Sequence, residues 1–277
     1  MLRLIDVRRS VRNPTEIPDM PLRSLRLVAL LALATLVSTA GLSAQDPITT
    51  VTTDAIAVHG NAWFGDLPDS SPLILLFHQG GSSGSGEYAQ IAPWLVEAGY
   101  RVITWDQRAG GDLHGSPNRT VAGLSSTGAV PTGFCDAMPD LEAALEYVRS
   151  ERLAERVLVW GSSYSGSLVF GLAAAHPETV AGVLAFSPAS GGPVEACRAG
   201  LWAPAVRAPM LVLRPASEME RATSVEQRDA LVAAGARFHV VTAGVHGSSM
   251  LVDERTGSDM AGPRGLVLEW LADVTSR

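Results

Sequence analysis

The chain after residue 44 alternates short apolar runs with longer segments in which apolar residues recur at helical spacing. Residues 72–77 (PLILLF) predict a buried strand, because they form a short run without internal polar residues. Similar runs predict strands at 100–105, 156–160, 180–186, 210–213 and 237–242. Helices are predicted over 87–98, 140–151, 164–175, 224–234 and 266–274, and one or two leading antiparallel strands over 48–64. This alternation indicates an α/β fold with a doubly wound, mostly parallel sheet and helices on both faces.

One long segment, residues 106–134, interrupts this alternation and is rich in Gly, Ser and Thr. It exceeds the length of ordinary connections and is predicted to be a loop, and loops of this size tend to be functional. The connection at 187–209 is too short for a large helical cap, so the cap over any site is expected to be minimal.

Residues 20–44 have the order of a secretory signal, in which positive charge comes first, an apolar run follows, and small residues precede a cleavage point. Arg23 and Arg26 supply the charge, and residues 27–37 the apolar run. That run is shorter than the roughly 18–20 residues that a membrane span needs. We therefore expect a cleaved signal within residues 1–44 and an exported, periplasmic or secreted protein, with a retained anchor as the alternative. Translation is expected to begin at Met20.

The composition supports one folded domain over residues 45–277. The full chain has 277 residues, of which 47% are hydrophobic, enough for one sizeable core. Its formal net charge of −7 argues against a nucleic-acid partner, because phosphate contacts need clustered basic residues. The two cysteines, Cys135 and Cys197, are too few for a structural zinc site or an iron–sulfur cluster. In an exported protein they are expected to form a disulfide.

The most specific motif is residues 160–166, Trp-Gly-Ser-Ser-Tyr-Ser-Gly, where an apolar strand runs into a predicted helix. Ser163 has a small residue two positions before it, Gly161, and another two positions after it, Ser165. A nucleophile on a sharp strand–helix turn needs this spacing, so that strand and helix can approach each other. The turn also puts the hydroxyl at a helix N-terminus, which favours developing negative charge. Ser163 is the predicted nucleophile; Ser165 and a simple capping role are the alternatives.

A serine nucleophile needs a base and an acid that orients it. His246 is the predicted base, because it is the one of the six histidines that lies late in the chain on a glycine-flanked loop after the last predicted strand. The acid should follow the preceding strand, where Glu218 occupies the loop and Glu220 lies two residues further. Glu195 and Glu226 are less suitably placed. Glu218 is therefore predicted, with Glu220 left open.

Two backbone N–H groups are needed to stabilise the oxyanion of an acyl-transfer reaction. Tyr164, directly after the predicted nucleophile, supplies the first. The second is expected from the turn at 78–84 (HQGGSSG), where Gly80 is preferred because glycine lets a substrate approach closely, and Gln79 is the alternative. The glycines of this turn lack the pattern of a phosphate-binding loop. No metal and no organic cofactor is therefore predicted.

With the order Ser163, Glu218, His246, the chain resembles the α/β-hydrolase superfamily over about residues 48–274. Residues 106–111 (DQRAGG) are similar to the acidic–x–Arg–Gly turn of that family, whose role is normally structural. HQGGSS and WGSSYSG together resemble a dienelactone-hydrolase-like or small esterase branch. The dienelactone hydrolases proper use Cys where this chain has Ser163, and the superfamily usually has Asp where this chain has Glu218.

The resemblance implies a secreted serine hydrolase that cleaves carboxylic esters through an acyl-enzyme, acting on a small-molecule ester or acyl substrate. A serine peptidase or amidase of the same fold and a non-catalytic binding protein are the alternatives. The intact strand–helix turn, the late histidine and the glycine-rich turn favour an enzyme. The 108–138 loop is expected to line the site, with Trp202 either as an apolar wall or as ordinary packing. Acyl-chain preference and oligomeric state do not follow from the sequence.

Overall fold

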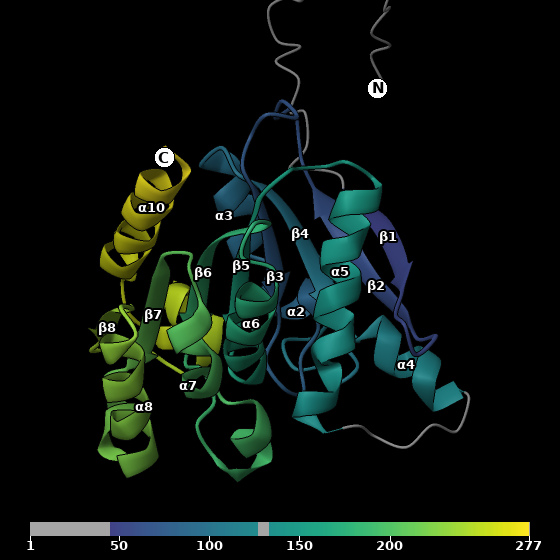
Figure 1. Cartoon of the computed structure of the whole chain (residues 1–277). Coiled ribbons are helices and arrows are strands. Elements are labelled where there is room, and N and C mark those ends of the chain that lie inside the picture. Colours follow the sequence, from purple (N-terminus) through teal and green to yellow (C-terminus); the bar gives the residue numbers. More distant parts are fainter. Residues whose placement is uncertain (1–44, 127–132, 277) are drawn as a thin grey trace, which may run out of the picture. The chain divides into compact units, whose positions relative to one another are not determined.

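A mostly parallel sheet forms the centre of the molecule in the computed structural model, which describes residues 45–126 and 133–276 (Figure 1). Within these ranges the sheet has eight strands in the order β1-β2-β4-β3-β5-β6-β7-β8. Strand β2 pairs antiparallel with β1 and with β4, and all other pairs are parallel. The strands are β1 Asp46–Val51, β2 Ala57–Trp63, β3 Leu73–Phe77, β4 Arg101–Asp106, β5 Val157–Ser162, β6 Val180–Phe186, β7 Met210–Pro215 and β8 Arg237–Val241. The predicted fold class is confirmed.

Helices cover both faces of the sheet. Helices α5, α6 and α8 pack on one face, and α3 and α10 pack on the other (Figure 1). Strand β3 shows the reason, since Leu73, Leu75 and Phe77 join the first core while Ile74 and Leu76 join the second. The helices of the described ranges are α2 Gly84–Glu87, α3 Ile91–Glu97, α4 Arg119–Ser126, α5 Met138–Ser150, α6 Tyr164–Ala175, α7 Ala199–Trp202, α8 Ala222–Ala233, α9 Asp253–Thr256 and α10 Ala261–Thr275.

Five short 3₁₀ helices lie in the connections of the described residues. They are η1 Phe134–Ala137, η2 Gly192–Cys197, η3 Ala203–Ala205, η4 Ala216–Glu220 and η5 Gly247–Leu251. Four of them, η1, η2, η4 and η5, carry or flank residues of the candidate site described below. The predicted signal at 20–44 and the predicted start at Met20 lie outside the described residues. Within residues 45–126 and 133–276, no helix combines the length and apolar character needed to cross a membrane.

Two local predictions are wrong. The helix predicted at 87–98 begins too early, because Glu87 ends the short helix α2, which Ser83 caps, and the helix that follows, α3, spans Ile91–Glu97. Residues 88–90 form a turn between the two helices, across which the Ile91 N–H donates to the Tyr88 carbonyl at 3.1 Å. The predicted loop at 106–134 contains α4, whose first turn is capped by Asn118: its Oδ1 accepts from the Val121 N–H at 2.8 Å. Side-chain caps therefore set where α2 and α4 begin.

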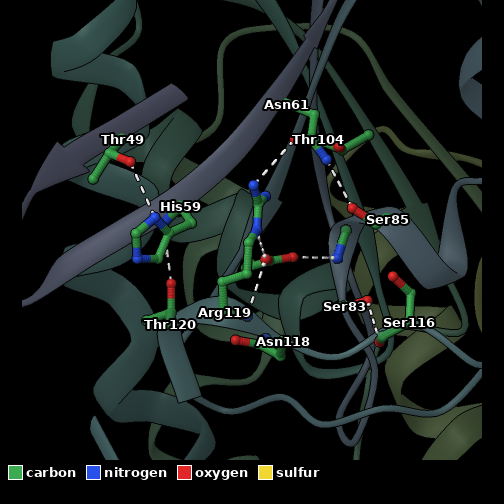
Figure 2. A network of polar contacts seen from close by, with 12 residues as sticks. Thr49, His59, Asn61, Ser83, Ser85, Thr104, Ser116, Asn118, Arg119 and Thr120 are labelled. Carbon is green, nitrogen blue, oxygen red and sulfur yellow. Dashed lines mark hydrogen bonds and ion pairs between the residues drawn. The ribbon is translucent and has the colours of Figure 1, made fainter. Parts of the chain in front are cut away.

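A polar network ties α4 to the strands beside it (Figure 2). Arg119 donates from Nε to Asp106 Oδ2 at 2.8 Å and from Nη1 to Asn61 Oδ1 at 3.2 Å. Asn61 in turn donates from Nδ2 to the Ser85 hydroxyl at 2.7 Å. Asp106 also accepts from the Gly84 N–H at 2.8 Å, which anchors α2 to the end of β4. The first residue of α4 is thus tied to β2 and to the end of β4.

The Asp-Gln-Arg turn after β4 has structural contacts. Arg108 donates from Nε to Asp140 Oδ1 at 2.8 Å and from Nη1 to Asp54 Oδ2 at 2.6 Å. The Arg108 N–H also donates to Asp140 Oδ2, at 2.7 Å. Because Asp140 lies in the first turn of α5, this buried pair fixes that helix against the end of β4.

Candidate active site

Ser163 lies on a strained turn between β5 and α6. Its φ of 59° and ψ of −116° place a non-glycine residue in the left-handed half of backbone space. Such strain is uncommon and clusters at functional sites. The side chain makes no capping hydrogen bond to α6, although Ser163 occupies the cap position. The hydroxyl is therefore not used for capping, and the residue is partly exposed.

The small residues around Ser163 let the strand and the helix meet. A Cβ on Gly161 would lie 2.3 Å from the Ser165 carbonyl oxygen, so only glycine fits there. Ser165 itself is fully buried. Its hydroxyl lies 2.6 Å from the Phe77 carbonyl oxygen and accepts from the Ser162 N–H at 2.9 Å. Ser165 thus fastens the turn to the end of β3 and is inaccessible as a nucleophile.

His246 and Glu218 meet across two loops on the same side of the sheet. His246 Nδ1 and Glu218 Oε1 are 2.5 Å apart, and the imidazole side chain is 51% exposed. Glu220 is exposed, whereas Glu218 is buried. Glu195 is exposed in η2, and Glu226 is exposed on α8. Of the four candidate carboxylates, the structure thus brings Glu218 to the histidine, because η4 turns its side chain inward.

Arg214, which the sequence analysis did not select, holds the other oxygen of Glu218. Its Nη1 donates to Glu218 Oε2 at 2.6 Å, and its Nη2 donates to Gln227 Oε1 at 2.6 Å and to the Pro188 carbonyl. Burial alone would raise the pKa of Glu218. The hydrogen bond from His246 and the charge of Arg214 outweigh it, so the pKa lies below its ordinary value. The sequence did offer one signal for this role, an arginine at the end of the otherwise apolar strand β7.

The two predicted oxyanion residues lie next to each other. A Cβ on Gly80 would be 3.8 Å from Tyr164 Cδ1 and only 2.8 Å from the ring of Phe134. The Phe134 and Tyr164 rings stack with centroids 4.8 Å apart. Phe134 is therefore a wall of the site and belongs to the 108–138 segment that was expected to line it, although the residue itself was not singled out. It covers the turn after β3, and Gly80 leaves the space that its ring fills.

The predicted disulfide is confirmed: Cys135 in η1 is bonded to Cys197 in η2. The bond joins the segment that carries Phe134 to the short connection after β6. Trp202 packs elsewhere, since a Cβ on Gly171 in α6 would meet its ring at 3.0 Å. Of the two interpretations of Trp202, the structure supports ordinary packing.

His78 orients the peptide that carries the Gly80 N–H. Its Nε2 accepts from the Gln107 N–H at 3.0 Å, and the Asn118 amide nitrogen lies 3.1 Å away. Because a backbone N–H can only donate, the ring proton must be on Nδ1, which lies 2.7 Å from the Gln79 carbonyl oxygen. That carbonyl belongs to the same peptide plane as the Gly80 N–H. The histidine thereby fixes where this N–H points.

We expect the stability of the protein to depend on His78 at acid pH. Burial lowers the pKa of His78 from 6.5 to about 4, so the unfolded chain binds a proton that the folded chain rejects. The free energy of unfolding should therefore fall as pH drops from 6.5 to 4, by about 3 kcal/mol from this group. Urea unfolding of wild type and a non-titrating His78→Asn variant at several pH values measures the difference.

The control for this experiment is His239→Asn, at a half-buried position on β8. It should follow the wild-type pH dependence. Parallel curves for wild type and His78→Asn would contradict the assignment of the neutral Nδ1–H form.

The loops that carry His246 and Ser163 are joined by a hydrogen bond between Ser248, two residues after His246, and Ser162, one residue before Ser163. The Ser248 N–H donates to the Ser162 hydroxyl oxygen at 2.9 Å, which ties η5 to the end of β5. No hydrogen bond joins the Ser163 and His246 side chains in the described residues. Nucleophile–base contacts are often loose before a substrate binds. The structure thus brings Glu218 to His246 directly, and His246 to the Ser163 turn through neighbouring residues.

A cavity of about 260 Å³ lies beside this arrangement, between α7 and α8. Arg198, Leu201, Glu226 and Gln227 are among its lining residues. None of the five predicted site residues lines it. In the described residues, no group of three or more His, Cys, Asp or Glu side chains could hold a metal ion.

The strand order, the strained serine turn and the histidine–carboxylate pair define a hydrolase of the α/β-hydrolase superfamily. The chain belongs to the family described as serine aminopeptidase, S33, whose model matches residues 69–248. The match includes Ser163, Glu218 and His246. One relative, the quorum-quenching protein AidA of Acinetobacter baumannii (strain MDR-ZJ06), is 28% identical over 125 residues. That match covers 44% of this chain and 37% of the relative.

Solved structures show the same fold at low sequence identity. Brefeldin A esterase, a bacterial homologue of human hormone sensitive lipase, matches with a TM-score of 0.65 and 16% identity, over 92% of this chain and 85% of its own. Dienelactone hydrolase from Anabaena variabilis matches with a TM-score of 0.61 and 17% identity, over 84% and 99%. Acylaminoacyl peptidase from Pyrococcus horikoshii matches with a TM-score of 0.59 and 16% identity, over 84% and 42%.

Proposed function

We propose that this hydrolase is a serine esterase that cleaves carboxylic esters through an acyl-enzyme. The observation that carries the proposal is the contact of 2.5 Å between His246 Nδ1 and Glu218 Oε1. It accompanies an uncapped Ser163 on a strained turn. A carboxylate on Nδ1 leaves Nε2 as the proton acceptor for a serine hydroxyl.

The proposed mechanism uses five residues. Ser163 attacks the ester carbonyl while His246 Nε2 accepts its proton, and the C–O bond breaks as the histidine protonates the leaving alcohol. Glu218 holds the imidazole in the required tautomer. The N–H groups of Tyr164 and Gly80 stabilise the oxyanion. Water then attacks the acyl-enzyme with His246 as the base, releasing the acid and restoring Ser163.

The names of the relatives support two substrate classes. Brefeldin A esterase and dienelactone hydrolase indicate esters and lactones, which share the same bond. The family description and acylaminoacyl peptidase indicate a peptidase or amidase, which is the second candidate. The connection between β6 and β7 holds only the short helices η2, α7 and η3, so the site has a minimal cap. This openness favours small soluble esters over long-chain lipids.

The test is a substrate panel on the purified protein, with p-nitrophenyl esters of increasing acyl length, simple lactones, and aminoacyl and acylaminoacyl p-nitroanilides. We expect kcat/KM to be highest for short esters or lactones. Hydrolysis of the anilides at a comparable rate would contradict the esterase proposal and favour the peptidase or amidase. If the well-folded protein neither turns over any substrate nor reacts with a fluorophosphonate, the non-catalytic binding protein would be the remaining interpretation.

We also propose that the protein is exported. The signal-like order of residues 20–44 and the disulfide between Cys135 and Cys197 both support this, because disulfides persist in oxidising compartments. N-terminal sequencing of the protein from its native host would test it. A mature N-terminus near residue 45 is expected, whereas an intact signal would indicate a retained anchor.

Loss of the disulfide is expected to destabilise the protein strongly. The bond closes a loop with a sequence separation of 62, and by loop-closure entropy it contributes about 4 kcal/mol. A Cys135→Ser/Cys197→Ser double variant should therefore unfold at a lower urea concentration than wild type. Wild type under reducing conditions is the matched control and should show the same shift. Two free thiols in unreduced, denatured wild type would contradict the bond.

A further inference from the structure

Glu87 is a fully buried carboxyl group that the proposed mechanism does not use. It ends α2, and its Oε2 accepts from the Gln79 N–H at 2.6 Å. Burial raises the pKa of Glu87, while the Ser162 hydroxyl, the hydrogen bond from the Gln79 N–H and the charge of Arg255 oppose the rise. Burying a carboxyl group costs free energy unless it is paired, so the partners of Glu87 indicate its role.

The second oxygen of Glu87, Oε1, lies among polar atoms that pack closely against Gly247. A Cβ on Gly247 would lie 2.4 Å from Ser162 Oγ, 2.5 Å from Gln79 Oε1 and 3.4 Å from Glu87 Oε1. The φ of Gly247 is +70°, which also favours glycine. Polar atoms from three separate segments therefore converge under the residue that follows His246.

The Ser162 hydroxyl connects this carboxyl group to the histidine loop. Its oxygen accepts from the Ser248 N–H at 2.9 Å, and the hydroxyl also interacts with Glu87, where it opposes the rise in the pKa of the carboxyl group. The Ser248 hydroxyl is itself fixed, because it accepts from Trp160 Nε1 at 2.8 Å. Ser162 and Ser248 are both fully buried, so water does not compete for these bonds.

Each segment joined here carries a proposed catalytic group. Gln79 precedes Gly80, Ser162 precedes Ser163, and Ser248 lies two residues after His246. From these contacts we propose that Glu87 is a positioning residue, whose carboxylate holds the oxyanion turn, the nucleophile turn and the histidine loop in one fixed arrangement. The inference rests on the proposed function, since it assigns Glu87 to the same reaction.

Two further groups complete the surroundings of Glu87. Arg255 in α9 donates from Nη1 to the Glu87 carbonyl at 2.8 Å and from Nη2 to the Gly86 carbonyl at 2.9 Å. It fixes the backbone of α2 and supplies positive charge near the carboxylate. His246 also interacts electrostatically with Glu87. Arg255 thus fixes the backbone from which the Glu87 side chain extends, and the Gln79 N–H holds its carboxylate.

The test compares Glu87→Leu, Glu87→Gln and wild type in p-nitrophenyl acetate hydrolysis, with rates corrected for active sites by fluorophosphonate titration. Leucine fills the space without a polar contact, whereas glutamine can still accept from the Gln79 N–H. We expect kcat to fall about 100-fold in Glu87→Leu with KM within threefold, because small misplacements of catalytic groups act on the rate. Glu87→Gln should recover most of that loss. Glu97→Leu, at an exposed position on α3, is the control and should match wild type.

Ser162→Ala keeps the experiment decisive if Glu87→Leu does not fold. It removes only the link to the histidine loop and should lower kcat about tenfold, again without a matching change in KM. If wild type is active and folded Glu87→Leu has an unchanged kcat, this inference alone would be overturned. Where Glu87→Leu does not fold, an unchanged kcat in Ser162→Ala would have the same meaning. So would a change in KM alone. An inactive, unlabelled wild type would overturn the proposed function and the inference with it.

Discussion

Ser163→Ala is expected to lower kcat/KM for p-nitrophenyl acetate about 10⁴-fold or more, because only the oxyanion groups and substrate binding would remain. The melting temperature should change little, since the Ser163 hydroxyl makes no capping hydrogen bond. Fluorophosphonate labelling should disappear with the activity. Mass spectrometry of the labelled wild type should place the modification on Ser163 and not on the buried Ser165.

Ser150→Ala, at an exposed position near the end of α5, is the matched control and should retain wild-type activity and labelling. A folded Ser163→Ala protein with substantial esterase activity would show that another group attacks the substrate. Label on wild type without turnover of any ester, lactone or anilide would mean that the serine is activated toward a substrate outside the panel.

Glu218→Gln is expected to lower kcat about 10⁴-fold, because an amide on Nδ1 no longer selects the tautomer in which Nε2 accepts the serine proton. KM should change little, since Glu218 is buried behind the imidazole and His246 separates it from any substrate. Arg214 retains an oxygen acceptor in this variant, so the protein should still fold. Steady-state kinetics and circular dichroism measure both effects.

Glu220→Gln is the matched control for this variant. Glu220 is exposed, two residues from Glu218 and in the same 3₁₀ helix, so its replacement should leave kcat unchanged. Equal losses in the two variants, or a loss in Glu220→Gln alone, would show that the carboxylate beside His246 is not the orienting acid.

Much of the fold follows from local patterns of the sequence. Strand β5 could be predicted because Val157–Trp160 is an unbroken apolar run, and its turn because glycine and serine flank Ser163. The failures at α2 and α4 have one cause. Their boundaries depend on caps by Ser83 and Asn118, and a short polar segment shows no periodicity that would separate a capped helix from a loop.

The candidate site divides in the same way. The sequence restricted the acid to Glu218 or Glu220, because both follow β7, but their spacing alone could not choose between them. The choice depends on which side chain η4 turns toward Arg214 and His246. The role of His78 could not be predicted for the same reason. Its position after β3 was visible in the sequence, but its partners Gln107 and Asn118 lie in the segment after β4.

The sequence by itself determined the strands of the sheet and the serine turn, because each depends on neighbours within a few positions. The succession of those strands also gave the order of the three predicted catalytic residues. Only the tertiary structure decided that Phe134 covers Gly80, that Arg214 supports Glu218, and that Glu87 lies beneath Gly247. These contacts join residues from separate elements. No local periodicity encodes them, because they arise when the parallel strands bring their carboxyl ends to one edge of the sheet.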